Sequence, residues 1–142
     1  MPRILIADDS STMRQLMRAM LQPEGYVMQE ATDGAEALAA LRSADAPMVV
    51  LLDYEMPNLT GEDVLRAVAE DGDGPLSANE YIVVSAHAGT FPESFIDLLR
   101  HLSIRILAKP FEREQLVPLV AQAVVRLTAP REDIFAQGQA EE

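Results

Sequence analysis

The chain contains no cysteine and few basic residues, and both shortages exclude whole classes of protein. Without thiols it has neither a disulfide framework nor a thiolate metal site, which is compatible with a reducing compartment. Its 11 lysines and arginines stand against 23 aspartates and glutamates, giving a formal net charge of -12 and an isoelectric point near 4.4. Because affinity for a phosphate backbone comes from clustered lysine and arginine, we expect no direct nucleic-acid binding.

Long apolar runs are also missing. The apolar stretch after Met1-Pro2-Arg3 is short and ends at two aspartates, so it lacks the long apolar core of a signal peptide. No stretch approaches the length needed to span a membrane. We therefore expect a cytoplasmic protein without membrane contact. The 142 residues, 49% of them hydrophobic, suit one domain with a sizeable core.

Apolar residues alternate between short continuous runs and helical periodicity. The short runs predict five buried strands, at residues 3–7, 26–30, 48–52, 81–85 and 104–108. The helical spacing predicts five helices, at residues 10–22, around Ala37 to Leu41, at 62–70, at 92–102 and over the pattern from Leu116 to Leu127. This alternation predicts an α/β fold with a doubly wound parallel sheet and right-handed crossovers.

One proline interrupts the last helical pattern. Because Pro118 removes a backbone hydrogen bond and clashes with the preceding turn, we predict that this helix starts late or kinks between residues 114 and 118. The residues that follow Pro130 have little periodicity. We therefore predict a loose C-terminal tail over residues 129–142.

Charged residues stand where three of the predicted strands end. Asp8-Asp9 follows the first strand, Asp53 the third, and Lys109-Pro110 the fifth. The carboxyl ends of parallel strands converge on one crevice, so we expect three carboxylates and one ammonium to meet there. Two carboxylates ~4 Å apart repel by roughly 4 kcal/mol at an effective dielectric constant of about 20. The cluster therefore needs a cation or must take up protons.

Mg²⁺ fits such a cluster, with Mn²⁺ as the alternative. Mg²⁺ is hard, prefers oxygen ligands, and is typically held by one or two carboxylates together with a substrate phosphate. A carboxylate beside this metal can attack phosphorus and become an aspartyl phosphate. The charged residues thus predict a divalent-metal and phosphoryl site.

Four fragments, in this order and at these spacings, resemble a bacterial response-regulator receiver domain of the chemotaxis-receiver type. They are Ile4-Leu5-Ile6-Ala7-Asp8-Asp9-Ser10, Val49-Val50-Leu51-Leu52-Asp53-Tyr54-Glu55-Met56-Pro57 with Gly61, Val83-Val84-Ser85-Ala86 and Ala108-Lys109-Pro110-Phe111. The resemblance covers roughly residues 2–127. It implies a flavodoxin-like, five-stranded parallel sheet with strand order 2-1-3-4-5, and hence a receiver domain over residues 1–128.

The resemblance gives each acidic residue a role. Asp53 is expected to be the phosphoacceptor. Asp9, Asp53 and the backbone carbonyl of Glu55 are expected to bind Mg²⁺ directly, whereas Asp8 acts mainly through water. The alternative for these aspartates is capping of a helix or turn, which Ser10 or Ser11 could perform equally well for the first helix.

The resemblance also implies roles for the residues that end the last two strands. Lys109 should pair with Asp53 in the resting state and with a phosphoryl oxygen afterwards, and the Ser85 hydroxyl should bind the incoming phosphoryl group. Their alternatives are a solvated surface lysine and an ordinary strand-end serine. The family has a cis peptide before Pro110, although an ordinary trans proline is equally compatible with the sequence.

Three further positions bear on regulation. Glu55 and His87 occupy positions that in the family influence how fast the phosphoryl group is lost, with an ordinary solvated pair as the alternative. Position 106 commonly holds a Tyr or Phe whose rotamer reports phosphorylation, but this chain has Ile106. The usual aromatic switch is therefore missing.

We accordingly predict a phosphoacceptor receiver domain of a two-component system rather than a turnover enzyme. It would accept a phosphoryl group on Asp53 from a sensor histidine kinase or a histidine phosphotransfer protein. It would then switch a surface for an unidentified downstream protein, with a homodimer as a further candidate. The alternatives are a phosphorylation-independent adaptor with the same fold and, ranked last, an aspartate-nucleophile phosphatase, whose D-x-D-x-T motif residues 53–57 match imperfectly.

Overall fold

Five strands alternate with five α-helices in the computed structural model, which describes residues 2–128. The elements are β1 (Arg3–Ala7), α1 (Ser11–Leu21), β2 (Val27–Ala31), α2 (Gly34–Ser43), β3 (Val49–Asp53), α3 (Gly61–Glu70), β4 (Glu80–Ser85), α4 (Glu93–Leu102), β5 (Arg105–Ala108) and α5 (Arg113–Thr128). Short 3-10 helices lie at Gln22–Glu24, Pro75–Ala78 and Ala88–Thr90. The predicted tail at 129–142 lies outside the described residues.

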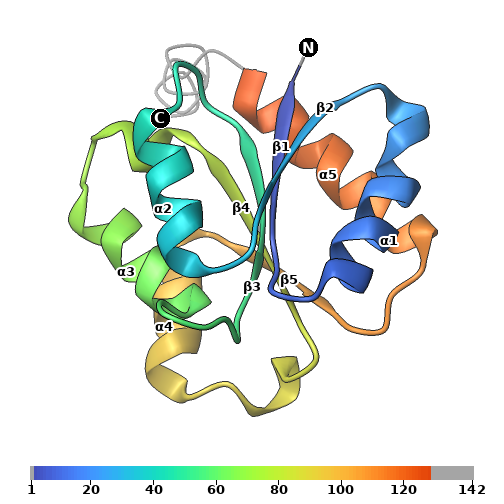
Figure 1. Cartoon of the computed structure of the whole chain (residues 1–142). Helices are drawn as coiled ribbons and strands as arrows, with labels where there is room; N and C mark the ends of the chain where they lie inside the picture. The colour runs from blue at the N-terminus through green and yellow to red at the C-terminus, as the bar shows by residue number, and fades with distance from the viewer. Residues whose placement is uncertain (1, 129–142) are drawn as a thin grey trace, which may run out of the picture.

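The strands form one parallel sheet in the order β2-β1-β3-β4-β5 (Figure 1). β1 lies between β2 and β3, so that Ile6 pairs with Glu30 on one side and with Leu51 on the other. The predicted doubly wound α/β fold and its strand order are confirmed. The carboxyl ends of β1 and β3 are therefore neighbours, as the metal hypothesis requires.

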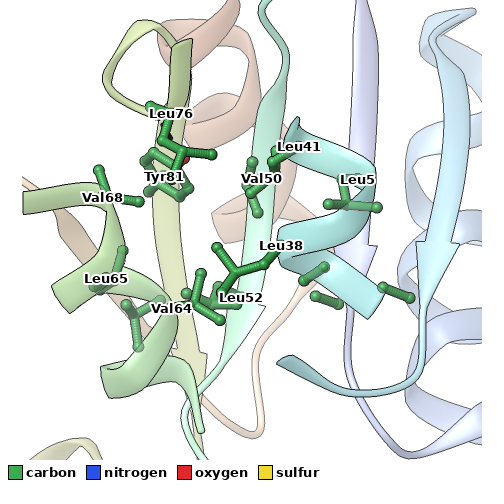
Figure 2. Packing of buried hydrophobic residues seen from close by; sticks show 14 of the residues in the cluster. Leu5, Leu38, Leu41, Val50, Leu52, Val64, Leu65, Val68, Leu76 and Tyr81 are labelled. Atoms are coloured by element: carbon green, nitrogen blue, oxygen red, sulfur yellow. Dashed lines mark hydrogen bonds between the residues drawn. The ribbon is translucent and has the colours of Figure 1, made fainter. Parts of the chain in front are cut away.

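Helices cover both faces of the sheet, and each face has its own apolar core. Helices α2, α3 and α4 pack on one face and α1 and α5 on the other (Figure 1). Figure 2 shows the first core, where Leu38 of α2 and Val64 of α3 meet Leu52 of β3. Because successive residues of a strand point to opposite faces, a sheet covered on both sides needs continuous apolar strands. This requirement explains the unbroken apolar runs of β1 and β3.

β2 begins and ends one residue later than its predicted range of 26–30. The parallel register explains the shift, because Arg3 pairs with Val27 and Ala7 pairs with Ala31. The amide of Asp8 donates to the carbonyl of Ala31 at 3.1 Å and continues this ladder beyond β1. The first acidic residue of the site is thereby fixed by the backbone of the sheet.

Helix α5 begins at Arg113 and runs without interruption through Pro118, so the predicted late start is wrong. Pro118 lies in the second turn, where it removes one hydrogen bond, the one that the carbonyl of Glu114 would accept. Both residues are exposed, so water can replace the missing donor. The free-energy cost of Pro118 is therefore too small to move the start of the helix.

Candidate functional site

Four of the predicted site residues lie at the carboxyl ends of four strands. Asp8 directly follows β1, Asp53 ends β3, Ser85 ends β4, and Lys109 directly follows β5. The order β1-β3-β4-β5 places these ends side by side, at the lower edge of the sheet in Figure 1. A cleft of about 490 Å³ opens there, and its lining includes Asp9, Asp53, Glu55, Met56, Pro57, Thr60, Ala86, His87 and Lys109.

The three carboxylates form a compact set of oxygen donors. Asp8, Asp9 and Asp53 each offer an oxygen atom, and these atoms all lie within 4.8 Å of one another. The side chains differ in accessibility, since Asp8 is 1% and Asp53 7% exposed whereas Asp9 is open to solvent. An all-oxygen set with one open side fits Mg²⁺, which keeps several of its waters.

Both side-chain oxygens of Asp8 accept a hydrogen bond. Its Oδ1 accepts a hydrogen bond from the amide of Ser10 at 2.9 Å, and its Oδ2 accepts one from Lys109 Nζ at 2.9 Å. Lys109 Nζ lies farther from Asp53 Oδ1, at 3.5 Å. The predicted resting pair between Lys109 and Asp53 is therefore shared with Asp8. Both carboxylates are buried, so each gains from a charged donor that offsets its loss of water.

Burial shapes the electrostatics of Asp53. It raises the pKa of Asp53 to about 6, and the negative charge of Asp8 adds to this effect, while Lys109 opposes it. A nearby divalent cation would favour the charged form in the same way as Lys109 does. The raised pKa of Asp53 agrees with the expectation that the cluster needs either a proton or a cation to offset its negative charge.

This pKa has a measurable consequence for the metal-free protein. Folded Asp53 retains its proton up to a pKa of about 6, whereas the unfolded chain releases it near the ordinary aspartate pKa of 3.8, so stability should fall as pH rises through this window. We expect Asp53→Asn, which cannot ionise, to raise the free energy of unfolding at about pH 7.5 by at most ~3 kcal/mol. Urea denaturation in EDTA measures this difference. Its persistence at about pH 3.5 would contradict the titration of Asp53 as the cause.

Other residues cap the helices that follow β1 and β3. Ser10 Oγ accepts a hydrogen bond from the amide of Met13 at the start of α1. Thr60 and Asp63 form a reciprocal capping box at the start of α3, with hydrogen bonds of 2.9 and 3.1 Å. Ser10 and Thr60, and not the three site carboxylates, therefore occupy the N-cap positions of these helices.

The residues that follow Asp53 and Ser85 meet at the rim of the cleft. Ser85 is 1% exposed, and its Oγ accepts a hydrogen bond from the amide of His87 at 2.9 Å. The imidazole Nε2 of His87 lies 3.3 Å from Glu55 Oε1, and both side chains are exposed. The two positions expected to influence phosphoryl loss are thus in contact, and their role stays a prediction.

The structure also places the remaining predicted positions. The peptide bond between Lys109 and Pro110 is cis. Ile106 pairs with Val83 in the sheet and is 40% exposed, at the edge strand. A half-exposed aliphatic side chain therefore stands at this edge of the sheet in place of an aromatic ring.

Arg14 was not predicted from the sequence, and it stabilises the turn that carries Asp8 and Asp9. Its Nη1 donates to the backbone carbonyl of Asp8 at 2.7 Å, and its Nε donates to Glu30 Oε1 at 2.8 Å. The side chain thereby ties the end of β1 to β2. An arginine one turn into a helix that begins beside two aspartates is the signal that could have identified it.

A second missed feature is a cluster of three rings beside the site. Tyr54, directly after Asp53, packs against Phe91 and Phe95 with centroid distances of 4.7 and 4.8 Å. The two phenylalanine rings meet edge to face at 4.9 Å. These rings connect the end of β3 to the start of α4.

Comparison with known proteins agrees with this geometry. The family model of the response regulator receiver domain matches residues 4–121. The chain belongs to this family. The resemblance seen in the sequence is thereby confirmed. Within residues 2–128, none of the helices is both long enough and apolar enough to cross a membrane.

The similar curated proteins carry different names and are longer than this chain. The chain is 37% identical over 116 residues to a protein-glutamate methylesterase/protein-glutamine glutaminase of Koribacter versatilis, covering 80% of this chain and 30% of the relative. It is 33% identical to the response regulator MprA of Mycobacterium avium, covering 92% of this chain and 54% of that protein. The chain thus spans about a third to a half of these relatives, and the esterase activity in the first name belongs to that longer protein.

Among solved structures, the response regulator TrrA of Thermotoga maritima is similar over most of the chain. The TM-score is 0.72 at 27% identity, and the match covers 87% of this chain and 99% of that one. That protein was solved in complex with Mg²⁺ and BeF.

Proposed function

We propose that this domain accepts a phosphoryl group on Asp53 from a sensor histidine kinase or a histidine phosphotransfer protein, with Mg²⁺ as cofactor. The observation that carries the proposal is the cluster of three carboxylates within 4.8 Å, with the Lys109 ammonium at its buried side. The Mg²⁺ complex of the Thermotoga maritima relative supports the choice of cation. Mn²⁺, with similar oxygen chemistry, is the alternative.

The transfer needs little covalent chemistry from the protein. An oxygen of the Asp53 carboxylate attacks the phosphorus of phosphohistidine, a P–O bond forms as the P–N bond breaks, and the donor imidazole nitrogen keeps the electron pair and takes up a proton. Bound Mg²⁺ supplies positive charge to the phosphoryl oxygens. Lys109 donates to one of these oxygens and Ser85 to another. Holding the reactants in line provides the rest of the rate.

The contacts of each aspartate suggest how the cation is shared. Both oxygens of Asp8 are already engaged, by the Ser10 amide and by Lys109 Nζ. Asp9 is exposed and lines the cleft together with Asp53. We therefore assign Asp9 and Asp53 as direct ligands, with Asp8 acting through water. We keep the carbonyl of Glu55, a residue that lines the same cleft, as the third direct ligand.

This assignment predicts unequal effects of two neutral substitutions. Asp9→Asn is expected to weaken Mg²⁺ binding by about a hundredfold and to abolish phosphorylation, because it removes a charged direct ligand. Asp8→Asn should weaken Mg²⁺ binding by roughly tenfold, the scale of a residue that acts through another group. Titration of Mg²⁺, followed through amide resonances of residues 8–10 and 53, measures both affinities. Equal affinity in wild type and Asp9→Asn would refute the ligand assignment.

A phosphorylation-independent adaptor remains the runner-up, and the complete acidic set with Lys109 counts against it. Incubation with Mg²⁺ and acetyl phosphate, followed by intact mass measurement, separates the two functions. The phosphatase hypothesis stays last, since Glu55 is exposed at the rim and paired with His87. The proposal includes a cytoplasmic location, with which the lack of cysteine is compatible.

Phosphorylation would switch a binding surface for a downstream protein or for a second copy of the domain. The net charge of -12 disfavours nucleic acid as the direct target. Since Ile106 is stiff and short, we propose that the signal leaves through residues 86–92 and the start of α4.

A further inference from the structure

The loop between β3 and α3, residues 54–60, forms one wall of the cleft. Glu55, Met56 and Pro57 line the cleft, and the base of the loop is closed by a hydrogen bond of 2.9 Å from the amide of Gly61 to the carbonyl of Tyr54. The Glu55 carbonyl belongs to this loop. Its position, and thus its fitness as a metal ligand, depends on the conformation of the loop.

The tip of this loop has a strained backbone. The amide of Leu59 donates to the carbonyl of Pro57 at 2.8 Å, and Asn58 between them has a φ of 68°. A three-residue turn with positive φ at its centre is rare and strained. Asn tolerates this region better than other side chains, but such a tip persists only when its surroundings hold it.

The holding contact comes from the turn before α2. Asn58 Nδ2 donates to Asp33 Oδ2 at 2.6 Å, while Asp33 Oδ1 accepts from the amide of Glu36 at 2.8 Å and caps α2. These hydrogen bonds, the Glu36 amide first, lower the pKa of Asp33, so it remains a charged acceptor. One carboxylate therefore joins the start of α2 to the tip of the loop.

The two segments also touch through their backbones. A Cβ atom added to Gly34 would lie 2.2 Å from the carbonyl oxygen of Leu59. Only glycine leaves room for this approach. The hydrogen bond between Asn58 and Asp33 thus lies beside a close backbone contact between Gly34 and Leu59. Together the two contacts join the tip of the loop to the start of α2.

We infer that Asp33 and Asn58 are positioning residues of the phosphoacceptor site, because their hydrogen bond fixes the loop that carries the Glu55 carbonyl. Neither belongs to the carboxylate cluster. Breaking the bond lets the strained tip relax, so the carbonyl is no longer preorganised for the cation. This inference rests on the proposed function, since it concerns Mg²⁺ binding at that site.

Two variants break the bond while sparing the local structure. Asp33→Ser keeps a good N-cap for α2 but is too short to reach Asn58. Asn58→Gly keeps a residue that adopts positive φ freely but has no side-chain donor. Asp33→Asn is the matched control, because it retains a capping oxygen and its amide can donate to Asn58 with the Asn58 side chain flipped. This control also removes the charge of Asp33.

We expect Asp33→Ser and Asn58→Gly each to raise the Kd for Mg²⁺ by about tenfold, and Asp33→Asn to stay within about threefold of wild type. The Kd comes from Mg²⁺ titration by amide resonances. Hydrogen exchange of the Leu59 and Gly61 amides in EDTA should speed up in the first two variants only. Melting temperatures identify any variant whose loss reflects global unfolding.

The outcomes separate this inference from the proposed function. Unchanged Kd values in both bond-breaking variants, beside a wild type that binds Mg²⁺, would overturn the positioning role alone. An equal loss in Asp33→Asn and Asp33→Ser would also overturn it, because the charge would then be the cause. A wild type that neither binds Mg²⁺ nor becomes phosphorylated would instead contradict the proposed function.

Discussion

Asp53→Asn is expected to remove all Mg²⁺-dependent phosphorylation of the domain. In wild type, incubation with Mg²⁺ and acetyl phosphate should add the mass of one phosphoryl group, which alkali then removes. Asp53 ends β3 beside Asp8, within reach of the Lys109 ammonium at 3.5 Å. An asparagine amide there keeps the shape of the side chain but lacks the nucleophilic carboxylate oxygen.

Loss of labelling in this variant would not reflect unfolding. The pKa of Asp53, raised to about 6, means that the neutral variant should be at least as stable as wild type without metal at neutral pH. Asp73→Asn is the matched control, because Asp73 is an exposed acid in the α3–β4 connection. It should be labelled to the wild-type extent. Labelling of Asp53→Asn to that same extent would rule out Asp53 as the acceptor.

Much of this site can be predicted from the sequence because apolar runs show where the strands end. The apolar residues before Asp53 and before Asp8 predict buried parallel strands, and parallel strands bring their carboxyl ends together. No side-chain detail is needed for that inference. The apolar run before Lys109 adds the ammonium group from the far end of the chain in the same way.

The remaining features depend on side-chain geometry that local patterns do not encode. Lys109 Nζ lies 2.9 Å from Asp8 and 3.5 Å from Asp53, and such a difference depends on how the whole fold places the three side chains. Asn58, with its positive φ, donates a hydrogen bond to Asp33, which lies 25 residues earlier in the chain and is not marked as its partner by any local pattern. Even Pro118, a strong local signal, was outweighed by the packing of α5 against the sheet.

The route of the signal out of the site can be predicted from the ring cluster. Tyr54 lies next to the phosphoacceptor, and its ring contacts both Phe91 and Phe95. Each such ring pair contributes about 0.5–1.5 kcal/mol beyond its burial. If Ser85 moves toward a phosphoryl group, the loop that carries Phe91 must move too. The rings then either rearrange or carry the start of α4 with them.

The alternative route along β5 is weak in this chain. Ile106 is β-branched and stiff at χ1, so it cannot sweep between buried and exposed positions as a Tyr or Phe ring does. The loop before α4 is less constrained by packing, since Ala86, His87, Gly89 and Thr90 are exposed. On binding a phosphate mimic with Mg²⁺, the largest amide shift and hydrogen-exchange changes outside the acidic cluster should fall in residues 86–96. Residues 104–108 should change less.

Phe91→Leu tests whether the rings carry this response. Leucine keeps an apolar contact but removes two of the three ring pairs, so changes at residues 93–96 should fall by about half or more while Asp53 is still phosphorylated. Ile106→Val, a change outside the cluster, should leave the response intact. Changes centred on residues 104–108, with 86–96 quiet, would mean that Ile106 takes part in the switch after all. If phosphorylated wild type showed no amide shift or hydrogen-exchange change in either segment, the adaptor hypothesis would be favoured. A domain whose surface does not change on phosphorylation cannot transmit that signal to a partner.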